Sequence, residues 1–400
     1  MRPRARRLVR VLALPVALVV LLSLGYGVLV DVRHERPAPL PAPAGPHPVG
    51  RATFTWTDHS RPGTGTSPRA GRELSVWLWY PAAPGTGHRA SYLPGAWRGL
   101  HLPGPVGLGE SGVDAVRAHE LDGATVAPGR FPLVVLMPGL GFAAPQYTAT
   151  AVDLASRGYL VAGMTPTGSA NLTVLHGQEV HATRAGNPPG FEGGHSAAAS
   201  RVAERLLGVW AADARFAVAR ARRLRGRFTG HLSGGRVAYV GHSFGGAAAL
   251  QACRDDPRCA GAVDLDGAQY GTVLSSGLGA PLLLVGHDGS CVTGVCRPSH
   301  AGDRADRDVA RRLLDRSAGP SWSLELNDTE HFEFTDYSAY YLARPLHLLL
   351  AVGSLPRGRA LATSDAYVAA FLRVAEGHAV PPLLAGPTTP YPEAHLRRQR

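Results

Sequence analysis

Short, continuous apolar runs alternate with helical segments along residues 131–328, and this alternation constrains the fold more than any other feature of the sequence. Runs without a polar residue at every second position are typical of strands buried on both faces. Such strands, separated by helices, favour a mainly parallel sheet in one α/β domain, with its ligand site at the carboxyl ends of the strands. We expect strands at 131–139, 159–165, 236–241, 259–266, 280–286 and 321–328, and helices at 145–158, 196–225, 244–253, 303–319 and 363–376.

The residues on either side of this pattern differ in character. Segments 51–58 (RATFTWTD) and 73–81 (ELSVWLWYP) alternate apolar and polar residues, which predicts half-buried antiparallel strands. Residues 82–130 are rich in glycine and proline, and we expect them to form a surface excursion near a site. We therefore place a catalytic domain at 51–378 and a C-terminal tail at 379–400.

The N-terminus has the composition of a membrane-spanning or export segment. Five arginines within residues 1–10 precede Val11–Val30, which carries no charge. As a helix this segment spans about 30 Å, the thickness of a bilayer core, whereas signal peptides have apolar cores of about 7–15 residues. We expect residues 1–30 to be an uncleaved anchor, or alternatively a cleaved signal peptide, with the domain outside the cytoplasm. Residues 31–50, with six prolines between 37 and 48, predict an extended linker.

The four cysteines form two close pairs, Cys253 with Cys259 and Cys291 with Cys296. Neither pair has the Cys-x2-Cys spacing or the added histidines usual in zinc sites. Two local disulfides formed in an oxidising compartment are the simpler interpretation, and free buried thiols are the alternative. The cysteines therefore agree with export of the domain.

The net charge of +11 arises in a chain whose 41 basic residues are all arginine. Codon usage explains this better than selection for arginine chemistry does. The arginines are spread out apart from clusters at both termini and at 201–227, so a solvated basic face is the simplest reading. This pattern does not indicate a nucleic-acid partner, and we find no motif for a metal or a cofactor. The oligomeric state is left open.

The stretch 236–250 (RVAYVGHSFGGAAAL) contains a G-x-S-x-G pattern from Gly241 to Gly245. By itself the pattern is weak, and a serine in a structural turn is the alternative. Its setting is stronger, because Ser243 falls where a predicted strand ends and a predicted helix begins. A turn there exposes the serine hydroxyl above the sheet, and small residues let the helix pack closely. We therefore predict Ser243 as a nucleophile.

A serine nucleophile needs a base, and in this chain order the base is a histidine downstream of an acid. His331 follows the last strong strand and begins a loop back toward the strand ends. His347 lies in an apolar helical segment and fits a core residue better. His242 is the variable residue of the serine motif and is expected to point elsewhere, and His287 comes too early in the chain. We predict His331 as the base.

The acid has two main candidates, because both lie where a predicted strand ends. Asp266 ends the run AGAVDLD, and Asp288 ends the next strand, in LLLVGHDGS. Position alone does not choose between them. Asp264 shares the strand of Asp266 but lies one pleat deeper, which makes it a weaker candidate. Asp288 precedes the second cysteine pair in a glycine-rich loop, where an aspartate can serve as a turn-former.

The oxyanion of an acyl-transfer reaction needs backbone N–H donors. One donor is expected from Phe244, the residue after the nucleophile. The other is expected from the turn MPGLGF that follows the strand 131–137. Pro138 has no N–H to donate, so Leu140 is the natural choice.

Taken together, these motifs resemble one family of α/β hydrolases. The segments PGLG, DLASRGYLVAG, GHSFGG, LDG and EHFEFTD, in this order over residues 51–345, are similar to the platelet-activating factor acetylhydrolases of the secreted, lipoprotein-associated type and their bacterial relatives. The family often has a histidine where this chain has Pro138, which changes the local polarity but leaves the donor in place. The resemblance is too weak over 82–130 to identify the substrate.

This resemblance implies an α/β-hydrolase fold and a role for each matched residue. It implies a calcium-independent serine hydrolase with Ser243 as nucleophile, Asp266 as acid and His331 as base. Leu140 and Phe244 become the oxyanion donors.

The sequence therefore predicts an extracytoplasmic serine esterase that removes short acyl groups from small or lipid esters, including phospholipids, without a cofactor. It predicts membrane association through the N-terminal helix. A cutinase-like polyester hydrolase or a lipase is an alternative of the same chemistry. A catalytically silent hydrolase fold that serves as a binding protein is an alternative of another class.

Overall fold

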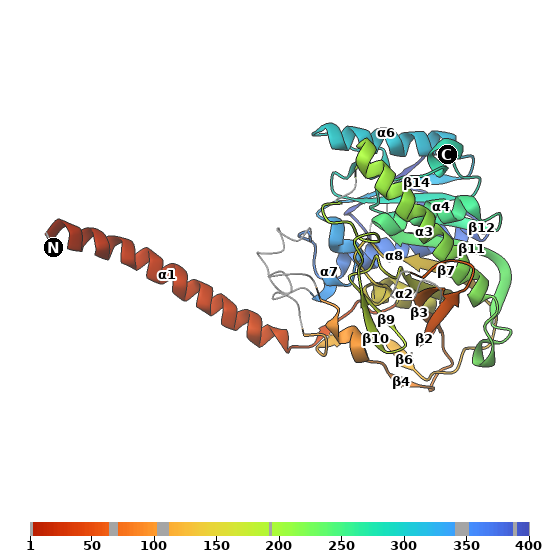
Figure 1. Ribbon diagram of the computed structural model, residues 1–400, viewed down its shortest axis with the longest axis horizontal. Coiled ribbons are helices and arrows are strands. Elements are labelled where there is room, and N and C mark those ends of the chain that lie inside the picture. The colour runs from red at the N-terminus through yellow and green to blue at the C-terminus, as the bar shows by residue number, and fades with distance from the viewer. Residues whose placement is uncertain are drawn as a thin grey trace.

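The computed structural model describes residues 3–63, 71–101, 112–191, 194–340, 352–386 and 390–399. Within these residues, one large sheet with helices on both faces forms the body, and a long N-terminal helix projects away from it (Figure 1).

The centre of the sheet consists of the runs that the sequence predicts as buried strands. They are β7 (Phe131–Met137), β8 (Leu160–Thr165), β11 (Leu232–His242), β12 (Cys259–Leu265), β13 (Leu282–His287) and β14 (Ser321–Leu326). They lie in the order β8–β7–β11–β12–β13–β14, and each neighbouring pair is parallel. The prediction of a mainly parallel sheet is confirmed.

Antiparallel strands extend the sheet at both edges. β3 (Arg72–Pro81) pairs antiparallel with β8 and with β2 (Val49–Asp58), which confirms the two antiparallel strands expected there, but β3 is buried along nearly its whole length rather than half-buried. The order continues through β6 (Glu120–Asp122) to β4 (His88–Arg89), and β15 (Ala394–Arg398) pairs antiparallel with β14 at the other edge. Two small sheets join β1 (Ala38–Pro39) to β5 (Val116–Arg117) and β9 (Leu172–Leu175) to β10 (Gln178–His181).

The helices cover the two faces of the sheet in two separate apolar cores. On one face are α2 (Thr148–Ser156), α7 (Tyr337–Tyr340) and α8 (Arg359–Ala375). On the other are α3 (Ala197–Ala221), α4 (Phe244–Asp255), α5 (Val273–Ser276) and α6 (Ala301–Arg316). Neighbouring residues of a strand point to opposite faces of the sheet and so into different cores. Val134, for example, packs in the first core and Val135 in the second. Short 3-10 helices are η2 (Gly95–Gly99), η4 (Ala144–Tyr147), η5 (Gly226–Phe228), η6 (Cys291–Thr293), η7 (His331–Phe334) and η9 (Pro382–Leu384).

The proline-rich segment predicted as a free linker is packed on the domain instead. The N–H groups of Ala44 and Gly45 donate to the side chains of Asp153 and Ser156 on α2, at 2.8 and 2.9 Å. Leu40 is buried in the first core. Prolines lack an N–H, but the residues between them keep theirs and use them to attach the segment. An extended chain can therefore serve as part of the body.

Two other segments also differ from expectation. Residues 82–130, predicted as an excursion near a site, contribute β4, β5 and β6 and bury side chains such as Trp97 in the first core, and none of their described residues lines the candidate site. Part of the predicted tail 379–400 forms β15. Neither segment has the apolar periodicity that reveals a strand in the sequence, because their strands are short and lie at or near an edge.

Helix α1 (Pro3–His34) contains the apolar N-terminal segment. Its window Pro15–Val32 has a mean hydropathy of 2.1 and is long and apolar enough to cross a membrane, and no part of it is buried against the domain. This fits an anchor and a signal sequence alike. The four cysteines form the two expected disulfides, Cys253–Cys259 and Cys291–Cys296.

Candidate active site

Ser243 occupies the turn between β11 and α4. Its backbone has φ 55° and ψ −127°. A side-chain-bearing residue in such a conformation costs about 1–3 kcal/mol, which structures retain mainly where function requires it. The turn places Ser243 in the wall of a pocket. This is the strained strand–turn–helix geometry that the G-x-S-x-G pattern predicts.

The glycines of the motif are required by close backbone contacts. A Cβ on Gly241 would lie 2.0 Å from the carbonyl oxygen of Gly245, and one on Gly245 would lie 2.2 Å from that of Pro138. No side chain fits at such distances. The motif therefore allows α4 to begin directly against β7 and β11, with Ser243 at the apex of the turn.

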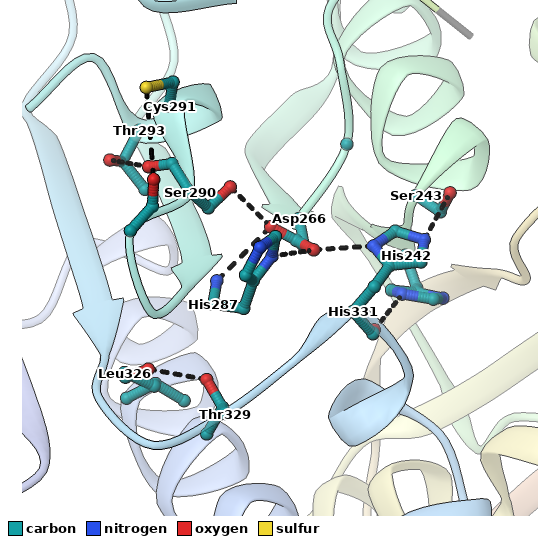
Figure 2. Close-up of polar contacts among 12 residues, drawn as sticks. His242, Ser243, Asp266, His287, Ser290, Cys291, Thr293, Leu326, Thr329 and His331 are labelled. Carbon is teal, nitrogen blue, oxygen red and sulfur yellow. Dashed lines mark hydrogen bonds and ion pairs between the residues drawn. The ribbon is translucent and has the colours of Figure 1, made fainter. Parts of the chain in front are cut away.

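The structure brings Ser243, Asp266 and His331 together from three strand ends (Figure 2). The Nε2 atom of His331 lies 3.0 Å from Ser243 Oγ. On the other side of the ring, Nδ1 lies 2.6 Å from Asp266 Oδ2. Asp266 directly follows β12, and His331 begins η7 just after β14. The parallel strands carry these residues to one edge of the sheet, so three residues far apart in sequence form one hydrogen-bonded chain.

Asp266 is held as an ionised carboxylate. Its Oδ1 accepts the Ser290 hydroxyl at 2.8 Å, and its Oδ2 accepts a second imidazole, that of His287, with Nδ1 at 2.6 Å. Burial alone would raise the pKa of Asp266, but the hydrogen bonds from His287 and His331 outweigh it and hold the pKa well below its usual range. The sequence analysis rejected His287 as too early in the chain to be the base and did not identify this contact.

The other two acid candidates have different partners. Asp288 is exposed, and its Oδ2 accepts the backbone N–H of Asp328 at 3.0 Å. Asp264 is buried beneath α4 and accepts the N–H of Gly267 at 2.9 Å, and burial raises its pKa well above the ordinary value. Among these candidates, Asp266 is the one that hydrogen-bonds His331. The histidine candidate His347 lies outside the described residues.

His242 links the two loops beside Ser243. The backbone carbonyl of His331 only accepts, so His242 Nε2 carries a proton and donates to it at 3.0 Å. Burial lowers the pKa of His242 to about 3, so the ring is neutral and its Nδ1 is unprotonated. The Tyr147 hydroxyl therefore donates to Nδ1 at 2.8 Å, and its oxygen accepts the Gly139 N–H, also at 2.8 Å. It points away from Ser243 Oγ, as expected, but its contact with His331 was not predicted.

Two N–H groups face the pocket beside Ser243. Leu140, Ser243 and Phe244 all line it. The N–H of Gly139 is bonded to Tyr147, whereas the N–H groups of Leu140 and Phe244 donate no hydrogen bond to any described residue. Phe244 also begins α4, where the helix dipole favours negative charge. Both residues predicted as oxyanion donors thus line the pocket that contains Ser243, and their role as donors stays a prediction.

The pocket around these groups has a volume of about 560 Å³. Phe142 and Phe332, with ring centroids 5.4 Å apart, lie near the oxyanion loop and His331. Asp303 and Asp306 of α6 form an acidic part of the rim. The aromatic residues that line the pocket are Phe142, Phe191, Phe244, Tyr270 and Phe332.

Asp266, His287 and His331 also form a group of possible metal ligands, whose donor atoms lie within 4.8 Å of one another. The 2.6 Å separations between the carboxylate oxygen and each Nδ1 are hydrogen-bond distances. Ligands of one tetrahedral zinc ion, each about 2.1 Å from it, lie about 3.4 Å apart. The three residues are therefore arranged for hydrogen bonding rather than for coordination.

Comparisons with known proteins include matches to two esterases. No protein-family model matches the chain. Over 172 residues the chain is 26% identical to a "Probable 1-alkyl-2-acetylglycerophosphocholine esterase" of Arthroderma benhamiae, a match that covers 40% of this chain and 42% of that protein. The chain thus spans less than half the length of this relative.

The second match is to a solved structure. A ferulic acid esterase from Streptomyces cinnamoneus superimposes with a TM-score of 0.73 and 29% sequence identity, covering 90% of this chain and 98% of that one. The chain therefore has the α/β-hydrolase fold and is similar to esterases of that fold, without being assigned to one particular family among them.

Proposed function

We propose that this chain is a serine esterase that hydrolyses carboxylic esters through an acyl-enzyme on Ser243. The observation that carries the proposal is the hydrogen-bonded chain from Ser243 Oγ through both ring nitrogens of His331 to Asp266. A serine hydroxyl becomes an effective nucleophile when a positioned base takes its proton. The two esterase matches support the same chemistry.

In the first half of the reaction, Ser243 Oγ attacks the carbonyl carbon of the ester while His331 Nε2 takes the hydroxyl proton. The tetrahedral adduct collapses when the imidazolium gives this proton to the departing alcohol. In the second half, His331 takes a proton from water, the resulting hydroxide adds to the acyl carbon, and Ser243 leaves with its proton restored. Asp266 stays ionised throughout and stabilises the imidazolium.

The negative oxygen of each tetrahedral adduct needs donors in place before it forms. In this proposal the donors are the N–H groups of Leu140 and Phe244, which face the pocket without other partners among the described residues. A donor of this kind contributes about 3 kcal/mol of transition-state stabilisation. The Tyr147 hydroxyl bonded to Gly139 and His242 supports the loop that carries Leu140.

For the acyl group we propose a short chain. The resemblance to acetylhydrolases supports this, as does the match to a phospholipid acetyl esterase. Hydrolysis of p-nitrophenyl esters from two to sixteen carbons tests it. The value of kcat/KM is expected to be highest for acetyl and butyryl esters, and a steady rise toward sixteen carbons would indicate a lipase instead.

A second candidate acyl group is an aromatic acid. Aromatic side chains form much of the pocket wall, and the matched solved structure is a ferulic acid esterase. Ring-bearing acyl groups gain from edge-to-face contacts with such walls. Methyl ferulate assayed beside p-nitrophenyl acetate distinguishes the two, because an aromatic preference gives a higher kcat/KM for the ferulate despite its poorer leaving group.

We further propose that the domain works outside the cytoplasm. The apolar window of α1 is exposed along its whole length, and the two disulfides fit an oxidising compartment. Fractionation of cells that express the full chain tests this. The protein is expected in the membrane fraction, or in the medium with the helix removed, and recovery from the cytoplasm with reduced cysteines would contradict the proposal.

The experiment that tests the function itself is covalent labelling. A fluorophosphonate reacts with a serine that is activated by a base, so mass spectrometry of the labelled protein is expected to find the adduct on Ser243. Asp266→Asn should slow the labelling strongly. A folded protein that takes up no label would favour a catalytically silent binding protein.

A further inference from the structure

The carboxylate of Asp266 accepts hydrogen bonds from two histidines at once. Its Oδ2 atom lies 2.6 Å from Nδ1 of His331 and 2.6 Å from Nδ1 of His287 (Figure 2). The reaction proposed above uses His331 alone. His287 ends β13, the strand beside β12, and its side chain lines the same pocket with 28% of its surface exposed.

The positions of the protons follow from these contacts. An ionised Asp266 only accepts hydrogen bonds, so both Nδ1 atoms must carry a proton. His331 Nε2 is then an acceptor toward Ser243, as a general base requires. In the neutral form of His287 the Nε2 atom is unprotonated, so His287 can take up a proton there without breaking its bond to Asp266.

We propose that His287 is a positioning residue that sets the acidic limit of the esterase activity, and this proposal rests on the function proposed above. In its neutral form, His287 donates one hydrogen bond and fixes the carboxylate that orients His331. In its protonated form, His287 also places a positive charge beside the same carboxylate. The transition state needs a positive His331, and one carboxylate stabilises two adjacent imidazolium rings less well than one.

The surroundings of His287 favour its protonated form. Burial lowers the pKa of His287, but the hydrogen bond to Asp266 and the negative charges of Asp266, Glu330 and Asp288 outweigh this and raise it above the ordinary value. Helix α8 also packs on β13, and its buried carboxylate, Asp365, interacts with Asp153. The other titratable groups near this part of the pocket are His242, Glu325, Asp328, His331 and, on the rim, Asp303 and Asp306.

A pH dependence follows from two rings that share one carboxylate. The pair binds its first proton at a higher pH than His331 would alone, because either ring can take it. If protonation of either His287 or His331 impairs the enzyme, activity begins to fall at that higher pH and decreases further as the pH is lowered. Removing the proton site on His287 must therefore move the acidic limb of the activity profile to lower pH.

The test is the pH profile of kcat/KM for His287→Asn, which keeps an N–H donor at the place of Nδ1 and cannot become charged. Each profile is scaled to its own maximum. If the two rings bind the first proton equally well, the midpoint of the acidic limb is expected to move down by about 0.3 pH units, the statistical factor for two equivalent sites. The matched control is His231→Asn, since half-buried His231 also uses Nδ1, to contact the Gly129 carbonyl, and lies at the opposite end of β11.

An acidic limb of His287→Asn that coincides with those of the unmodified protein and His231→Asn would overturn the proposal. NMR titration of the histidine rings in the unmodified protein gives a second measurement that needs no variant. The His287 ring must bind a proton over the pH range in which activity falls, and a ring that stays neutral there would also overturn it. Failure of the proposed function looks different, because Ser243→Ala would then retain activity.

Discussion

The Nε2–H of His242 donates to the backbone carbonyl of His331, 3.0 Å away, so the residue before the proposed nucleophile holds the loop of the proposed base. On its other side, His242 accepts the Tyr147 hydroxyl proton, and Tyr147 in turn accepts the Gly139 N–H. One buried neutral ring thus connects the oxyanion loop, the nucleophile turn and the histidine loop. Its contacts fix the distances on which the proposed reaction depends.

Replacing this ring should therefore damage catalysis without removing any reacting group. His242→Phe keeps the ring shape and removes both hydrogen bonds, and we expect kcat to fall about 100-fold, the usual cost of a misplacement near 1 Å. Tyr147→Phe removes the hydroxyl's bonds to Gly139 and His242 but keeps the bond from His242 to His331, and should lose less. Steady-state kinetics on p-nitrophenyl acetate measure both, and a His242→Phe enzyme with unchanged kcat would show that the connection is not needed.

The choice of acid gives a second prediction. Asp266→Asn should lower kcat by about 10⁴-fold, because the amide no longer holds His331 in the required tautomer. Asp288→Asn should keep its activity and lose some stability, since Asp288 accepts only the backbone N–H of Asp328 at the surface. Measuring kcat and Tm for both variants checks this. An inactive, well-folded Asp288→Asn beside an active Asp266→Asn would contradict the assignment.

The two disulfides are expected to have different roles. Cys291 and Cys296 enclose η6, directly after Ser290, whose hydroxyl donates to Asp266. Removing this bond by serine substitution should reduce both stability and kcat. Removing Cys253–Cys259, at the far end of α4, should reduce stability alone. A short loop of this kind contributes about 2 kcal/mol.

Chemical denaturation and esterase assays separate these two effects. Equal kcat values for the two cysteine variants would show that the second disulfide has no special role near the site.

A fourth prediction concerns the packing beneath the nucleophile turn. A Cβ at Gly246 would lie 1.7 Å from Oδ1 of Asp264, which is buried and hydrogen-bonded. Gly246→Ala should therefore destabilise the fold by about 3 kcal/mol or prevent folding. Gly279→Ala is the control, because nothing lies within 4 Å of its added Cβ. Similar denaturation midpoints for the two variants would contradict this view of the turn.

Much of the fold can be predicted from the sequence, because strands buried on both faces must be continuously apolar. The pattern locates all six parallel strands and the longer helices between them, but not the four-residue α5. It does not locate the two-residue β1 or the edge strand β15, whose pairing depends on distant partners rather than on local periodicity. The proline-rich segment was misjudged for the same reason, since its hydrogen bonds are made to Asp153 and Ser156 on α2.

The candidate site, like the fold, could be predicted from the sequence only in part. Ser243 and His331 can be selected from motif and chain order, and the resemblance favours Asp266 over Asp288. The second histidine on Asp266 was missed because distance along the chain was used to reject His287. A better signal was present: His287 ends β13 next to β12, and parallel neighbours bring their carboxyl ends together.

The most direct test of the account is the activity of Ser243→Ala on p-nitrophenyl acetate, with the fold checked by circular dichroism. If Ser243 forms the acyl-enzyme, removing its hydroxyl should lower kcat by about 10⁶-fold and leave the spectrum unchanged. A folded Ser243→Ala protein whose activity remains within about tenfold of the original would contradict the central claim, because a lost nucleophile costs far more than that.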